Sequence, residues 1–119
     1  DQRLIRRFFM THVTIYRNKE NECIGFTVIG HAEYADAGED IICAGISMLV
    51  INTCNAIEAL TTVKFSLTTN ESEGLIDLRL KEKPTKETEL LLSALILGFE
   101  NMADDQDYKE YIHLTFEEV

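Results

Sequence analysis

Basic residues are scarce in this sequence, and their scarcity argues against one class of partner. The 119 residues include 11 lysines and arginines against 21 acidic residues, which gives a formal net charge of −10 at pH 7. Proteins that bind DNA or RNA gain much of their affinity from clustered basic side chains that neutralise phosphates. Direct nucleic-acid binding is therefore disfavoured. The same negative charge would attract a basic partner and speed its encounter with the protein.

Cysteines are also few, and their spacing excludes two kinds of site. The chain has Cys23, Cys43 and Cys54 and no Cys-x-x-Cys pair. An odd number of cysteines without paired spacing fits neither a disulfide framework nor a structural zinc site. We expect three reduced thiols and no metal site.

A long apolar run is missing as well. The longest one, residues 41–51, has 11 residues and includes Ser47, whereas a membrane span needs about 20 apolar residues. The first nine residues carry three arginines but no apolar stretch like that of a secretory signal. We therefore expect no membrane anchor and a cytoplasmic location. We interpret residues 1–9, which precede Met10, as a remnant of recombinant expression.

The rest of the chain has the composition of one globular domain. Hydrophobic residues make up 45% and charged residues 27%, and a chain of this length can bury a core of its own. Alternating apolar residues predict strands, and two longer apolar patterns predict helices. The expected elements are strands at 13–17, 24–30, 63–67, 76–80 and 112–116, with helices at about 40–60 and 85–102. This ββαββαβ order predicts an α+β two-layer sandwich, with two helices packed on one face of a mainly antiparallel sheet.

The first predicted helix begins behind an acidic residue. Asp40 precedes the helical pattern directly, and its carboxylate can accept the unpaired amide hydrogens of a first turn, so we predict that Asp40 is the N-cap. Apolar residues occupy nearly every face of this helix. That pattern predicts a central buried helix, with Met48 in the core.

Two residues near the start of this helix are candidates for catalysis. His31 follows the second strand, and Cys43 falls in the predicted first turn, where the helix dipole and free amides favour a thiolate. A histidine base and a cysteine nucleophile brought together there could attack a carbonyl group. The backbone amides of Cys43 and Ala44 would then hydrogen-bond the oxyanion.

Each of these residues also has a plain structural interpretation. His31 could be a capping or surface residue, and Cys43 could be a small buried hydrophobe. Ser47, one helical turn after Cys43, could contact the sulfur or a substrate, or it could bond its own helix backbone. The charge of Asp40 would disfavour a thiolate at Cys43, or Asp40 could instead orient His31. Cys54 lies about three turns further on, roughly 16 Å along the helix, too far to share the site.

One stretch of the sequence resembles a known family. Gly30-His31-Ala32, followed by a glycine-bearing loop and then by Asp-Ile-Ile-Cys-Ala-Gly-Ile-Ser at residues 40–47, closely resembles the motif of the ribosomal-processing cysteine protease family, Prp. The likeness continues through residues 52–57 and, more loosely, over residues 10–119. By position, the resemblance implies that His31 and Cys43 form a catalytic dyad, with Asp40 and Ser47 in supporting roles.

The resemblance also implies an activity and partners. The expected protein is a single cysteine protease domain over residues 10–119, an endopeptidase that removes an N-terminal extension from a large-subunit ribosomal protein after paired phenylalanines. It further implies a homodimer without a metal or cofactor. Such a substrate is basic, which agrees with the independent argument from charge.

Two other functions stay open from the sequence. The first is a non-catalytic ribosome-assembly or protein-binding module in which Cys43 is a core residue. The second is a thiol redox sensor, which would need a resolving cysteine close to Cys43. Cys54 is too distant along the helix for that role.

Overall fold

The structure, a computed structural model, describes residues 10–30 and 37–119, with the backbone alone for residues 37–40. Its elements are β1 (Thr11–Arg17), β2 (Cys23–Ile29), α2 (Ala37–Leu60), β3 (Phe65–Asn70), β4 (Leu75–Leu80), α3 (Lys86–Asp104) and β5 (Ile112–Glu118), with short 3-10 helices η1 (Glu71–Glu73) and η2 (Lys109–Tyr111). The predicted ββαββαβ order is confirmed. The strand bounds differ from the predicted ones by no more than a few residues, as is usual at element ends.

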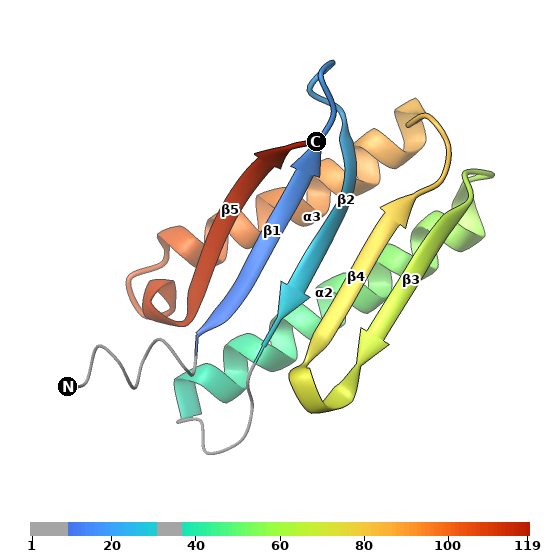
Figure 1. Ribbon diagram of the computed structural model, residues 1–119. Coiled ribbons are helices and arrows are strands. Elements are labelled where there is room, and N and C mark those ends of the chain that lie inside the picture. Colours follow the sequence, from blue (N-terminus) through green and yellow to red (C-terminus); the bar gives the residue numbers. More distant parts are fainter. Residues whose placement is uncertain (1–9, 31–36) are drawn as a thin grey trace.

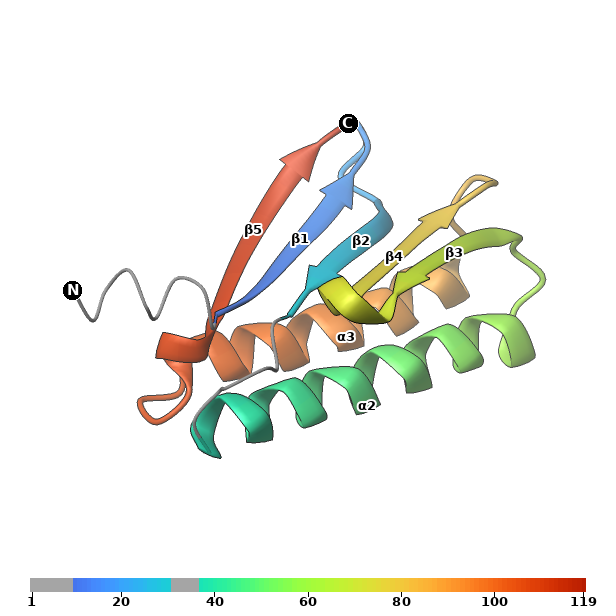
Figure 2. The ribbon, with the colours of Figure 1, turned by 60° about the horizontal axis from the view of Figure 1, so that its bottom comes forward.

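The strands form one mixed sheet covered by the helices on one side. The order across the sheet is β3-β4-β2-β1-β5. The pairs β1–β2, β2–β4 and β3–β4 are antiparallel, and β1–β5 is parallel. Figures 1 and 2 show α2 and α3 side by side on the same face, which confirms the predicted two-layer α+β sandwich. The last strand, β5, forms one edge of the sheet and lies next to the first strand, β1 (Figure 1).

The core lies between the sheet and the two helices. Alternate residues of the strands point toward the helices, as the period of two in a strand requires. The fully buried side chains include Val13, Ile15, Phe26 and Leu78 from the sheet and Val50, Ile57, Leu92 and Phe99 from the helices. Burying each such side chain stabilises the fold by roughly 1.5–3 kcal/mol. This layer of packing fixes the helices on the sheet and therefore positions everything that α2 carries.

The first helix starts earlier than the sequence predicts. α2 begins at Ala37, so Asp40 lies inside the first turn, and the prediction that Asp40 is the N-cap is wrong. Acidic residues are favoured throughout a first turn as well as at the cap, because the dipole attracts them in both places. The acidic character of Asp40 therefore could not locate the start of the helix. Cys43 consequently lies in the second turn.

α2 is also less buried than its composition suggests. Met48 is 75% exposed, so its predicted place in the core is wrong, and Ile41, Ile51 and Leu60 are exposed too. In a two-layer sandwich a helix buries only the face that packs on the sheet. The stretch Ile41–Leu60 is long and apolar enough to cross a membrane by length and composition, with a mean hydropathy of 1.6. The residues of this stretch that are buried, among them Val50 and Ile57, belong to the core between helix and sheet.

The second helix begins where the sequence predicts. Thr85 is its N-cap, and the Thr85 and Thr88 side chains each accept a hydrogen bond from the backbone amide of the other, at 3.2 and 3.0 Å. This reciprocal pair satisfies two amides that a helix start leaves without partners.

A glycine allows a ring and a cation to stack on the open face of the sheet. Gly25 of β2 lies between Tyr16 of β1 and Arg79 of β4, pairing with both. The Arg79 guanidinium carbon lies 3.8 Å from the centroid of the Tyr16 ring. A Cβ on Gly25 would lie 2.8 Å from the Arg79 Cδ and would overlap the Leu78 carbonyl oxygen. Any larger residue must therefore displace Arg79 and the β4 backbone.

We expect the substitution Gly25→Ala to lower the free energy of unfolding by about 1–3 kcal/mol, the usual cost of overpacking. Urea titration followed by circular dichroism measures it. Gly45→Ala in α2 is the matched control, because the nearest atom to its new methyl group is the Met102 Cε at 3.6 Å. Alanine should keep or raise stability there, by up to about 1 kcal/mol. Equal unfolding midpoints for the two variants would contradict this account of Gly25.

Candidate active site

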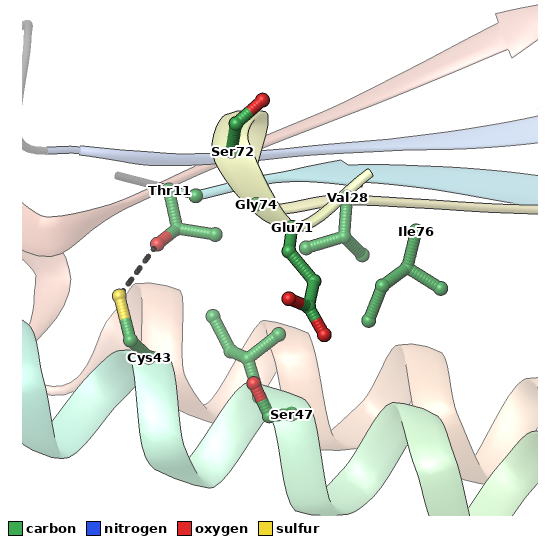
Figure 3. Close-up of a pocket in the computed structure, with 10 residues that line it drawn as sticks. Thr11, Val28, Cys43, Ser47, Glu71, Ser72, Gly74 and Ile76 are labelled. Atoms are coloured by element: carbon green, nitrogen blue, oxygen red, sulfur yellow. Dashed lines mark hydrogen bonds between the residues drawn. The ribbon is translucent and has the colours of Figure 1, made fainter. Parts of the chain in front are cut away.

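A pocket of about 200 Å³ opens between the first half of α2 and the sheet. Figure 3 shows it bounded below by α2 and above by η1, with β1 and β2 behind. Its lining residues come from four separate parts of the chain: Thr11, Val28, Gly30, Cys43, Ile46, Ser47, Glu71, Ser72, Gly74 and Ile76. The pocket therefore exists only in the folded chain.

Cys43 is the cysteine that lines this pocket. Its side chain is partly buried, and its Sγ lies 3.5 Å from the Oγ1 of Thr11, close enough for a hydrogen bond in which either atom is the donor. A Cβ placed on Gly30 would lie 3.9 Å from the same sulfur. The end of β2, which leads directly to His31 in the sequence, is thus next to Cys43.

The other two thiols belong to the core. Cys23 is 3% and Cys54 is 7% exposed, and neither lines the pocket. Burial raises the pKa of the Cys23 thiol, a backbone hydrogen bond with Gly25 lowers it by less, and the charge of Glu89 raises it further. Burial likewise raises the pKa of Cys54. Both thiols therefore stay protonated at neutral pH.

The structure brings some of the predicted site residues together. Ser47 lines the pocket with Cys43, as their spacing of one helical turn predicts. His31 and the side chain of Asp40 lie outside the described residues, so their predicted roles stay predictions. In the described part of the chain no group of three histidine, cysteine or acidic side chains is placed to hold a metal ion.

The structure places the two predicted oxyanion donors inside α2. Because α2 begins at Ala37, the amides of Cys43 and Ala44 fall inside the helix. There each amide bonds the carbonyl four residues earlier. These amides are not available to an oxyanion in this form of the helix. Only the first turn of a helix has free amides, and the early start of α2 moves that turn away from Cys43.

No local pattern in the sequence indicates the residues that close the pocket from above. Thr11 lies at the start of β1, and Glu71, Ser72 and Gly74 belong to the turn between β3 and β4. The polar residues of this turn indicated a loop, but nothing local indicated which loop would face Cys43. The pairing of β2 with β4 determines it, since it places Gly74 beside Gly30.

Backbone contacts fix this turn against the end of β2. The Asn70 Oδ1 accepts hydrogen bonds from the amides of Ser72 and Glu73, at 3.0 and 3.3 Å. The Gly30 amide donates to the Gly74 carbonyl at 3.1 Å. Gly74 has a φ of 61°, and a Cβ there would overlap the Gly30 carbonyl. Glycine is therefore required at this position, both for the left-handed backbone and for the close approach.

A partly exposed thiol in a small pocket lined by hydroxyl groups is typical of a cysteine-dependent enzyme. Comparison with known proteins gives the class of enzyme. Residues 10–113 match the profile of the family described as Cysteine protease Prp. The chain belongs to this family of cysteine proteases, which confirms the resemblance seen in the motif.

Relatives with curated names and solved structures agree with this assignment. The chain is 27% identical over 110 residues to Ribosomal processing cysteine protease Prp of Bacillus subtilis (strain 168), covering 89% of this chain and 96% of that protein. Crystal structures of an essential ribosomal processing protease Prp from S. aureus are similar in fold. One holds a substrate peptide, with a TM-score of 0.84 at 26% identity. The other holds a covalently linked product peptide, with a TM-score of 0.79 at 27% identity. Each structural match covers 91% of this chain and 100% of the S. aureus chain.

The difference in burial among the three thiols predicts selective labelling. With iodoacetamide near neutral pH, we expect Cys43 to be alkylated at least about tenfold faster than Cys23 or Cys54, because exposed thiols react and buried, protonated ones do not. Peptide mapping by mass spectrometry follows each site separately. After unfolding in urea all three should react at similar rates. Preferential labelling of Cys23 or Cys54 in the folded protein would contradict the described environments.

Proposed function

We propose that this protein is an endopeptidase that removes the N-terminal extension of a large-subunit ribosomal protein, with Cys43 as the nucleophile. One observation carries the proposal: of the three cysteines, Cys43 alone lines the pocket. The relatives named ribosomal processing proteases support the substrate class. The covalently linked product peptide in the S. aureus relative supports a covalent route.

The proposed reaction has two halves. In the first, His31 accepts the thiol proton of Cys43, the sulfur attacks the scissile carbonyl carbon, and the carbon–nitrogen bond breaks as His31 returns the proton to the leaving amine. This leaves a thioester on Cys43. In the second half, water activated by His31 hydrolyses the thioester and restores the thiol. Gly30 precedes His31 and lies close to the Cys43 sulfur. This supports the contact between His31 and Cys43 that the reaction requires.

Hydroxyl groups in the pocket can assist this chemistry. The Thr11 hydroxyl can donate a hydrogen bond to the thiolate of Cys43. Ser47 presents a second hydroxyl to the same pocket, which supports the auxiliary role that the motif assigns to it. Because hydroxyl groups rotate, each can also turn its hydrogen toward an oxyanion as charge develops on the substrate carbonyl. Asp40 would orient His31 in this scheme.

Charge favours the proposed substrate. The protein carries a formal net charge of −10, and ribosomal proteins are rich in lysine and arginine. Complementary charge raises the rate of encounter more than the strength of the final complex. The extension of a basic protein would thus be captured efficiently.

The alternatives fit the structure less well. A binding module in which Cys43 is a core residue would need a buried thiol, whereas Cys43 lines a pocket and the core thiols are Cys23 and Cys54. A redox sensor would need one of those two thiols near Cys43. Both are buried and absent from its pocket.

We expect the substitution Cys43→Ala to reduce cleavage of an extended ribosomal-protein substrate by more than about 10³-fold, because the covalent step is lost. Mass spectrometry of the substrate measures the extent of cleavage. Cys54→Ala is the matched control: it removes a thiol of the same helix and should keep its activity, at a stability cost on the order of 1 kcal/mol for the cavity. Full activity of the Cys43→Ala variant would refute the proposed nucleophile.

We also propose that the protein is a homodimer that pairs through the outer face of α2. Ile41, Met48 and Ile51 are 57%, 75% and 54% exposed on this helix. Exposed apolar groups in such numbers on one element mark an interaction surface. A two-fold dimer would cover the same face of both copies at once.

The dimer proposal predicts that Met48→Glu shifts the protein to monomers, because a charge in an apolar interface loses its hydration without a partner. Sedimentation velocity measures the oligomeric state. Val119→Glu places the same charge at an exposed apolar residue away from the helices and should stay dimeric. A wild-type protein that sediments as a monomer at micromolar concentration would overturn the proposal.

A further inference from the structure

One carboxylate lines the pocket that contains Cys43. Glu71 belongs to η1, and Figure 3 shows its side chain extending from this turn toward α2, with Ser47 below it and Val28 and Ile76 beside it. Within the described residues, the Glu71 side chain has no hydrogen-bond or ion-pair partner. A carboxylate that points into a pocket and has no partner among the described residues can bind a ligand.

The position of Glu71 relative to Cys43 is fixed by the backbone. Asn70 caps η1 from one side, and Gly74 is hydrogen-bonded to Gly30 on the other. Gly30 in turn lies next to the Cys43 sulfur. The turn is therefore held beside the end of β2 that lies next to the sulfur, and Glu71 and Cys43 line the same pocket.

The chemistry of the pocket favours one kind of substrate side chain. An ionised carboxylate accepts hydrogen bonds and donates none. A bound peptide would displace water from Glu71, and an apolar substrate side chain would then leave the carboxylate without a partner, which is costly. A side chain with N–H groups would replace the lost water and gain a charge-assisted bond. A carboxylate of this kind therefore discriminates against a substrate whose side chain lacks an N–H donor.

We propose that Glu71 determines substrate specificity: its carboxylate binds an N–H-bearing side chain of the substrate, an ammonium, guanidinium or primary amide group, at one position close to the scissile bond. This inference rests on the proposed peptidase function and adds a residue that recognises the substrate. The apolar wall formed by Val28, Ile46 and Ile76 would contact the carbon stem of the same side chain.

The neighbouring Glu73 provides a matched control. It belongs to the same η1 turn as Glu71 but does not line the pocket. Glu71→Gln and Glu73→Gln change the net charge equally, so both weaken long-range attraction to a basic substrate by the same amount. A difference between the two variants therefore reports direct contact in the pocket.

The test uses a set of peptides in which each residue near the scissile bond is replaced in turn by Lys, Gln and Met, which have similar lengths. At one position the wild-type protein should prefer Lys or Gln over Met by about tenfold in kcat/KM. Glu71→Leu should abolish that preference, and Glu73→Gln should keep it. Glu71→Gln separates the two donor classes, because a neutral amide still accepts a bond from Gln but no longer attracts Lys.

Binding measured without catalysis separates this proposal from the proposed function. Fluorescence anisotropy of the labelled peptides on the Cys43→Ala variant, with and without Glu71→Leu, should show the same loss of preference. If the wild-type protein cleaves no peptide, the peptidase function fails while the binding data still test Glu71. Equal preferences in wild type and Glu71→Leu, an equal loss in Glu73→Gln, or no preference in wild type at any position would each overturn the proposal.

Discussion

The contact between Gly30 and Gly74 is the constraint on which the pocket depends. It joins the end of β2, which leads to the histidine of the family motif, to the turn that covers Cys43 from above. Both residues are glycines, and at Gly74 the left-handed backbone and the close carbonyl together leave no room for a side chain. Without this contact the turn that carries Glu71 would no longer be held over the pocket, and the pocket would lose its upper wall.

The helix α2 links the site to the core. Its inner face packs on the sheet through residues such as Val50 and Ile57. Close apolar packing therefore fixes the position of the helix against the sheet and resists small shifts. Cys43 and Ser47 lie where the covered face meets the pocket. A partly buried thiol is thus open to the pocket and carried on a rigid element, an arrangement that suits precise positioning of a functional group. The outer face of the same helix leaves several apolar residues exposed.

Local patterns predicted the elements well and their ends poorly. The alternation of Val13 with Ile15, and of Ile76 with Leu78, is a direct consequence of one buried and one exposed face, and the structure confirms both strands. The start of α2 was misplaced because Asp40 suits a first turn as well as a cap. Met48 was misplaced because hydropathy reports that a residue is apolar, without reporting which side of the helix meets the sheet.

The sequence by itself determined the element order, the two-layer architecture and the family, since these follow from short-range periodicity and from a motif contained in residues 30–47. Tertiary structure decided the strand order, the exposure of α2 and the identity of the residues around Cys43. Thr11 and Glu71 are far from Cys43 along the chain and reach its pocket only through strand pairing. The neighbouring sequence does not mark either residue as functional, because hydroxyl and carboxylate side chains are common in turns and at strand ends. Only the register of β2 against β4, with the packing of α2 beneath, gives them a place in a site.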